Sequence, residues 1–189
     1  MDEFLLPFLC ALILGQGARD QITLARLAAG IGAKASLLVV AIITCALTAA
    51  IMAWAGAEIA ALMPPRARYM LIAIALAFGA AELFWPVRIP VAKEPTWSLG
   101  AIGAVLFIRQ IGDAARFAIF AFAAYAHAPS LAWAGGALGA AAALVMGVTW
   151  RDELIDPARQ STLRAARIGG GVVMAAGAVW FALLGRAML

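Results

Sequence analysis

The chain has 189 residues, of which 66% are apolar, and its mean hydropathy is +0.98. Soluble domains contain about 45–50% apolar residues, so this composition excludes an ordinary water-soluble protein. The formal net charge is +4, but the basic residues gather in short connections between apolar blocks. Membrane topology explains that distribution without a nucleic-acid partner. Cys10, Cys45 and His127 form no redox or metal-binding motif, and no cofactor is predicted.

The apolar residues form blocks of about 20 residues, the length that a helix needs to cross a hydrocarbon core of about 30 Å. Since a backbone in lipid must satisfy its own hydrogen bonds, we predict an all-α integral membrane protein with six transmembrane helices. In chain order the predicted spans are Phe4–Ala29, Ala35–Ala57, Tyr69–Trp85, Leu99–Ala126, Ser130–Val148 and Ile168–Leu184. Prolines, which block helix continuation, lie in several of the connections: Pro64, Pro65, Pro86, Pro90 and Pro129.

Two of these spans carry polar side chains where a membrane helix is normally apolar. They lie between Gln16 and Gln21 in the first span and around Asp113 in the fourth. Ionisable groups at this depth are costly and mark a binding site or a pathway. Glycine loosens a helix and permits close approach, so we expect breaks or close crossings at Gly15, Gly17 and Gly112. The predicted pathway residues are Gln16, Gly17, Asp20, Glu82, Arg109, Gln110, Gly112, Asp113 and Arg116.

The two polar interruptions superpose when the chain is shifted by 95 residues, which places Gly17 on Gly112. Each half then has three spans, with its polar cluster in the first. Because three is odd, the second half enters the membrane from the opposite side. We therefore predict one membrane domain built from two inverted three-helix repeats, residues 1–95 and 96–189. The site of such a protein lies where the two polar segments meet, near the bilayer midplane.

Two spans also carry small residues at every fourth position, a pattern that lets helix backbones approach closely. We predict tight packing within the chain, with a dimer seam as the alternative. The small residues are Ala41, Cys45, Ala49, Ala53 and Ala57 in the second span and Gly135, Gly139, Ala143 and Gly147 in the fifth.

Basic residues are distributed unequally between the two ends of the spans, and cytoplasmic loops carry the excess of Lys and Arg. One end has Lys34, Arg88, Lys93, Arg151, Arg159, Arg164 and Arg167, and the other has Arg66, Arg68 and Arg186. This asymmetry predicts that both termini lie outside. The expected location is a bacterial inner (plasma) membrane.

Two segments resemble the signature of the Golgi, chloroplast and bacterial calcium/manganese–proton antiporters: Gly15–Gln21 followed by Leu27–Ala29, and Gln110–Arg116 followed by Phe122–Ala124. Members of that family have two three-helix repeats of opposite orientation, each with the motif Glu-x-Gly-Asp-Lys/Arg-Ser/Thr. The resemblance spans nearly the whole chain in length, span number and repeat spacing. The family's glutamates fall on Gly15 and Gln110, its aspartates on Ala18 and Asp113, its glycines on Gly17 and Gly112, its basic residues on Arg19 and Ala114, and its hydroxyl residues on Asp20 and Ala115. One of four motif carboxylates is therefore in place, and Asp20 is displaced by two residues.

The resemblance implies a secondary transporter that exchanges manganese or calcium for protons at the repeat interface. Hard divalent cations prefer oxygen ligands, so Asp20, Glu82 and Asp113 are the predicted metal ligands, with amide oxygens from Gln16 and Gln110. Asp113 and Glu82 would release protons as the ion binds. The expected partners are the lipid bilayer, a divalent cation and protons.

The arginines favour other interpretations. Arg109 precedes Asp113 by four residues and Arg116 follows it by three, so in one helix all three would share a face. Arginine stays charged, and a neutralised aspartate attracts a dication weakly. The alternatives are an exporter of a small anionic or zwitterionic solute, and a non-transporting relic of the family in which Asp113 belongs to a structural ion pair. The sequence has no nucleophile–base pair, metal-ligand cluster or nucleotide loop, so an enzyme is not predicted.

Overall fold

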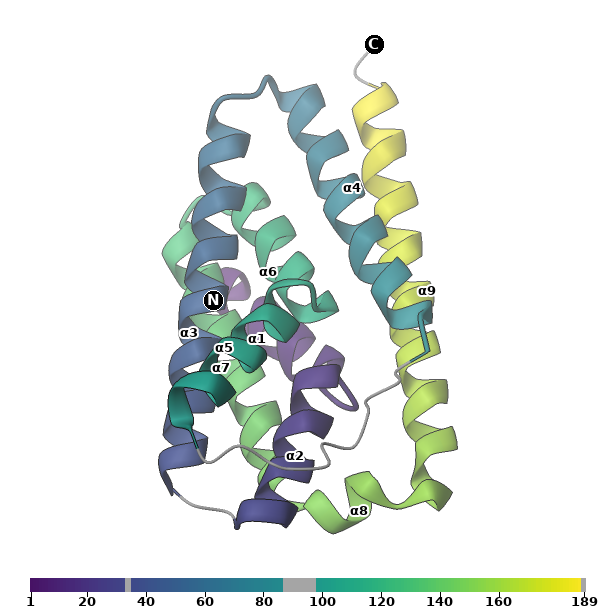
Figure 1. The fold of residues 1–189 in the computed structure, drawn as a ribbon. Coiled ribbons are helices and arrows are strands. Elements are labelled where there is room, and N and C mark those ends of the chain that lie inside the picture. Colours follow the sequence, from purple (N-terminus) through teal and green to yellow (C-terminus); the bar gives the residue numbers. More distant parts are fainter. Residues whose placement is uncertain (33–34, 87–97, 188–189) are drawn as a thin grey trace.

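The computed structural model describes residues 1–32, 35–86 and 98–187, and within these ranges every regular element is an α-helix (Figure 1). The helices are α1 (Asp2–Leu14), α2 (Arg19–Ile31), α3 (Ala35–Ala61), α4 (Pro65–Phe84), α5 (Leu99–Ile111), α6 (Ala114–Tyr125), α7 (Pro129–Thr149), α8 (Arg151–Ile155) and α9 (Pro157–Ala187). The prediction of an all-helical protein is therefore confirmed.

Four of the helices are long and apolar enough to cross a membrane: α3, α4, α7 and the Ser161–Ala187 part of α9. Their outward-facing side chains are large and apolar; Ile43, Phe78 and Val173, for example, are 59%, 58% and 72% exposed. Buried positions are instead mostly alanine, together with several polar and charged residues. Apolar surface around a partly polar interior fits a protein surrounded by lipid.

α4 and α9 begin at least one helical turn earlier than the sequence predicts. α4 begins at Pro65 rather than Tyr69, because proline at the first helical position lacks only an N–H that would have no partner there. α9 begins at Pro157 rather than Ile168, so the charged connection predicted before the last span is instead its first turns. That segment is rich in alanine, arginine and leucine, which favour helix even in water.

The first and fourth predicted spans are each broken into two short helices. α1 and α2 have 13 residues each and are separated by residues 15–18. α5 has 13 residues and α6 has 12, and they are separated by Gly112 and Asp113. The polar segments therefore fall at helix breaks, as their sequence predicts.

The short helices pack beside long ones (Figure 1). α1 runs parallel to α7: Gly135 lies on the Phe4 carbonyl and Gly139 on the Phe8 carbonyl, at separations that a Cβ atom would not permit. α6 runs parallel to α3, with Gly56 against the Phe120 carbonyl. α4 and α9 lie side by side over most of their length and run in opposite directions.

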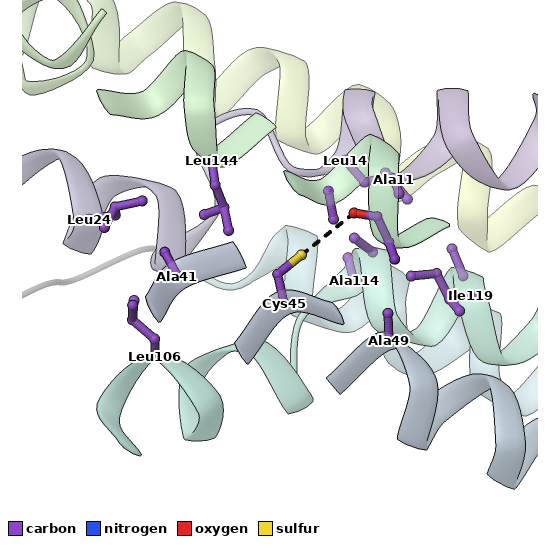
Figure 2. Packing of buried hydrophobic residues seen from close by; sticks show 14 of the residues in the cluster. Ala11, Leu14, Leu24, Ala41, Cys45, Ala49, Leu106, Ala114, Ile119 and Leu144 are labelled. Carbon is purple, nitrogen blue, oxygen red and sulfur yellow. Dashed lines mark hydrogen bonds between the residues drawn. The ribbon is translucent and has the colours of Figure 1, made fainter. Parts of the chain in front are cut away.

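The core joins α3 to the broken helices and to α7 (Figure 2). Cys45 is fully buried, and its thiol donates to the carbonyl of Ala137 at 3.8 Å. Ala41, Ala49 and Ala53 on the same stripe are also buried, as are the small residues of α7. The predicted stripes therefore serve packing within the chain, although Ala57 is only partly buried.

Candidate functional site

The first helix break is closed by two glutamine side chains. Gly17 has φ +70°, which a glycine adopts at little cost and which turns the chain between α1 and α2. Its N–H donates to Gln21 Oε1 at 2.7 Å. The Gln21 amide in turn donates to Gln16 Oε1 at 3.2 Å and to the carbonyl of Ala143 on α7 at 2.6 Å. Gln16 also donates to Leu12 O at 3.1 Å, so both amides serve the backbone at the break.

A guanidinium from α9 completes this region. Arg167 is 6% exposed and donates to the carbonyl of Gly17 at 3.3 Å. Its Nη2 lies 2.9 and 3.0 Å from the two carboxylate oxygens of Glu82 on α4. Arg19 Nε lies 3.3 Å from the same carboxylate. Glu82 is thus shared by two arginines and fixes the first break to α4 and α9.

The second break is built from charged residues. Asp113 caps α6, accepting from the N–H of Ala115 at 3.3 Å, and is 3.9 Å from Arg116 Nη1. Arg116 is 1% exposed and donates through Nε to Thr48 Oγ1 on α3 at 3.2 Å. Thr48 Oγ1 also lies 3.3 Å from Gln110 Oε1, at the end of α5. One threonine hydroxyl therefore connects both halves of the broken helix to α3.

Several polar atoms at the second break are buried without a hydrogen-bond partner: Gln110 Nε2, Asp113 Oδ1 and Arg116 Nη2. Arg19 Nε also lacks a hydrogen bond, but it has the ion pair with Glu82. Buried polar groups are nearly always satisfied, and each exception calls for an explanation. The second break therefore offers two donors and one acceptor to a ligand.

The charged residues of both breaks belong to one electrostatic centre. Asp113 lies within electrostatic range of Asp20, Glu82, Arg116 and Arg167. Asp20 is 3% exposed, and its Oδ1 accepts from the N–H of Gln21 at 2.8 Å. The structure therefore brings the polar segments of the two halves together, and each carboxylate has a guanidinium nearby.

The three predicted metal ligands, Asp20, Glu82 and Asp113, do not form one close group. Among the described residues, no group of three or more His, Cys, Asp and Glu side chains lies close enough together to hold a metal ion. Asp20, Glu82 and Asp113 share an electrostatic environment but not a ligand shell. Glu82 is held by Arg19 and Arg167, which occupy the positions that a cation would need.

The prediction that Arg109, Asp113 and Arg116 share one helix face is also wrong. It assumed a continuous helix, but α5 ends at Ile111 and α6 starts at Ala114. Because the chain turns at residues 112–113, Arg109 and Asp113 are not one helical turn apart on a common helix. Asp113 pairs with Arg116, and none of the ion pairs among the described residues includes Arg109.

Gly112 differs from Gly17, although a shift of 95 residues along the chain superposes them. Its φ is −99°, and a Cβ there would have no atom within 4 Å. Gly112 thus lies at a break, as predicted, without a conformation that only glycine favours. Gly15 fits the prediction of a close crossing, since a Cβ there would lie 2.7 Å from the Ala143 Cβ.

Four residues of the two breaks were not among the predicted pathway residues: Arg167, Thr48, Gln21 and Arg19, the last of which lies within the first polar segment. Thr48 is a polar residue within an otherwise apolar span, and Gln21 ends the first polar segment, so both carried a signal in the sequence. Arg167 stands at the edge of the charged connection, and nothing local indicates that it turns inward.

No protein-family model matches this chain, and neither a curated protein nor a solved structure does. The functional assignment depends on the side chains described above.

Proposed function

We propose that the chain is a secondary transporter for a small zwitterionic solute, and that its site is the buried centre between the two helix breaks. The observation that carries the proposal is the set of unpartnered polar atoms on Gln110, Asp113 and Arg116. Intramembrane charges are expensive and are associated with substrate pathways. Broken helices at the midplane are a recurring way of building such sites in transporters.

The contacts between helices support an inverted repeat of residues 1–95 and 96–189. Gln21 donates to Ala143 on α7, and Arg116 donates to Thr48 on α3. These two pairs exchange when each residue is moved by 95 positions to the other half. The same shift relates the close approach of Gly139 to Phe8 with that of Gly103 to Thr44.

Such a repeat would cross the bilayer six times, because each broken helix pair then completes one crossing beside the four long helices. Two repeats of opposite orientation, each with an odd number of spans, place a shared site at their interface, where one half can rock against the other. α1 lies beside α7 and α5 lies beside α3, and the 95-residue shift exchanges these two helix pairs as well.

The donor and acceptor inventory favours a zwitterion. Arg116 Nη2 and Gln110 Nε2 are donors suited to an anionic group such as a carboxylate. Asp113 Oδ1 is an acceptor suited to an ammonium group. The surrounding charges are balanced, so a solute with both signs adds no net charge to a buried centre.

Manganese– or calcium–proton exchange, which the sequence resemblance implies, is the second candidate. The free Asp113 Oδ1, with Asp20 and Glu82 in electrostatic range, is the observation in its favour. The arginine partners of Glu82 weigh against it, because they already neutralise that carboxylate.

The test is flux into proteoliposomes that contain the full chain. The probes are radiolabelled neutral amino acids for the zwitterion hypothesis and manganese and calcium ions, under an imposed pH gradient, for the antiporter hypothesis. We expect amino-acid flux in the wild type, its loss in Arg116→Gln, and wild-type flux in the matched surface variant Arg159→Gln. Arg116→Lys keeps the charge but loses the Nη2 donor, and we expect it to fold and to transport poorly.

Proton-coupled manganese or calcium flux that Asp113→Asn abolishes, without amino-acid flux, would replace the first candidate with the second. If monodisperse wild-type protein moves neither class of probe, the chain is a non-transporting relative and both candidates fail.

We further propose that both termini face the outside of a bacterial inner membrane. Arg66 and Gly185 lie together at one end of the α4–α9 pair, whereas Arg151 and Arg159 belong to the α8 end. The larger number of basic residues at the α8 end favours the cytoplasm for that end. Reporter fusions at each terminus test this, and cytoplasmic activity of either fusion contradicts it.

A further inference from the structure

A cavity of about 350 Å³ lies where α2, the end of α4 and the first half of α9 meet. Arginines from two different helices line it: Arg26 from α2, and Arg164 and Arg167 from α9. Aromatic side chains at the end of α4, Phe84 and Trp85, form part of its wall. Among the described residues that line this cavity, none is acidic.

The cavity carries positive charge that the described residues do not fully neutralise. Glu82, which does not line the cavity, neutralises the charge of Arg167 through an ion pair. Arg164 is exposed, and none of the ion pairs among the described residues includes it. Arg26 contributes a guanidinium from α2 to the same lining. An anionic group in the cavity would therefore lie beside positive charge from both α2 and α9.

The outer side of the cavity is apolar and exposed. Phe84, Trp85 and Ile168 are 48%, 68% and 42% exposed. On α9 this surface continues to Val172, which is 57% exposed. Tryptophan concentrates where a membrane meets water, so Trp85 fits a position at headgroup level. The cavity thus joins a cationic recess to apolar surface of the kind that acyl chains cover.

We propose that this cavity binds the headgroup of an anionic phospholipid, with its acyl chains along Phe84, Ile168 and Val172. Guanidinium groups pair with phosphate through two parallel hydrogen bonds. Basic recesses between membrane helices on the cytoplasmic side are suited to anionic lipid headgroups. A free phosphate shares the charge chemistry but has no use for the exposed apolar flank.

The bound lipid would connect α2 to α9 across the cavity, because Arg26 and Arg164 belong to different helices. A ligand that binds only the folded state raises thermal stability by an amount that grows with the ratio of its concentration to its Kd. The inference is independent of the transported solute and goes beyond the transport activity proposed above.

The experiment uses the purified full chain in detergent, titrated with phosphatidylglycerol, phosphatidylcholine or inorganic phosphate. Lipid retention in native mass spectrometry and the shift in Tm are both recorded. We expect phosphatidylglycerol to bind at least about tenfold more tightly than phosphatidylcholine and to raise the Tm. Each lost arginine should weaken phosphatidylglycerol binding about fivefold, so Arg26→Gln with Arg164→Gln should weaken it about twenty-five-fold.

Arg159→Gln is the matched control, since it removes the same charge from α9 but does not line the cavity. Arg26→Lys with Arg164→Lys keeps both charges, and we expect it to retain most of the preference, which separates lost binding from misfolding. Equal binding of the two lipids to the wild type, or a double Gln variant that binds like Arg159→Gln, overturns the proposal. Inorganic phosphate that reproduces the Tm shift also overturns it, in favour of a soluble ligand.

Amino-acid flux measured with the same variants keeps this proposal separate from the transport proposal. Lost lipid preference with normal flux supports the lipid site alone, and failed flux in wild-type protein that still prefers phosphatidylglycerol rejects only the transport proposal.

Discussion

The two helix breaks use different chemistry to satisfy an interrupted backbone. At the first break, Gln16 and Gln21 bond to backbone groups and to each other, and Arg167 arrives from α9 to complete the network. At the second break, Asp113 and Arg116 pair within one short helix and leave polar atoms without partners. The side chains at the first break therefore hydrogen-bond to one another and to the backbone, whereas the second break keeps donors and an acceptor without partners.

This difference follows from the residue types at positions that the 95-residue shift superposes. Gln21 and Arg116, which the 95-residue shift superposes, each donate to a long helix in the other half of the chain: Gln21 to α7 and Arg116 to α3. Gln21 has a neutral amide, whereas Arg116 carries a charge. A neutral amide can be satisfied locally, while a buried guanidinium has five N–H donors to place. Most of the buried polar atoms without a hydrogen-bond partner therefore lie at the second break.

The largest expected effect concerns the first break. Glu82→Gln leaves Arg167 buried without its carboxylate partner, and removing one member of a buried ion pair costs about 3–5 kcal/mol. Denaturant unfolding in detergent measures the loss. Glu153→Gln is the matched control, because its pair with Arg159 is exposed and such pairs contribute about 0–1 kcal/mol. Equal losses in both variants would show that the first break does not depend on the α4–α9 pair.

A smaller loss is expected at the second break from Thr48→Val. The change removes the hydroxyl between Arg116 and Gln110 and leaves both side chains with a further unmet group, at a cost of about 1–3 kcal/mol. Thr44→Val is the control, since the Thr44 hydroxyl bonds only to carbonyls of its own helix. The free energies of unfolding of the two variants are compared, and a Thr44→Val loss as large as that of Thr48→Val would contradict a bridging role for Thr48.

The glycines of the two breaks provide a direct contrast. Gly17→Ala places a Cβ at φ +70°, which costs about 1–2 kcal/mol for an L-residue. Gly112→Ala meets open space at φ −99°, so we expect stability to stay constant or rise by up to about 1 kcal/mol. Thermal unfolding of the two variants side by side tests the contrast, and similar behaviour would mean that the breaks share one backbone conformation.

The smallest effect lies outside both breaks. Glu3 accepts from the N–H groups of His127 and Ala128 at 2.9 and 3.0 Å, and these hydrogen bonds hold the pKa of Glu3 below its ordinary value. A lowered folded-state pKa contributes stability that is complete above the unfolded value of about 4.3 and is lost as the pH falls through the folded value.

Glu3→Gln should therefore lower the Tm at pH 7, and the difference from wild type should shrink below about pH 4. Asp2→Asn, a change at the neighbouring exposed carboxylate, is the control. A Glu3→Gln difference that persists unchanged in acid would exclude the carboxylate as its source.

Much of the fold followed from local patterns. The polar segments predicted helix breaks because lipid-buried backbone must be helical unless other groups satisfy it. The breaks occur at residues 15–18 and 112–113. The four-residue spacing of small side chains also predicted which faces of α3 and α7 are buried.

The errors arose where a local rule assumed continuity. Arg109 was placed with Asp113 because four residues make a helical turn, but the turn at Gly112 redirects the chain. Glu82 was predicted as a metal ligand from its chemistry alone, and its partners lie 63 and 85 residues away along the chain.

Composition and the periodicity of apolar, small and polar residues thus determined the helical class, the lipid-facing surface and the positions of both breaks. Each of those properties depends on neighbours within a few turns of the same helix. Only the tertiary structure decided which charges meet, because pairings such as Arg167 with Glu82 exist only once α4 and α9 lie side by side. The same packing decided which polar atoms remain unpaired, and these atoms carry the proposed function.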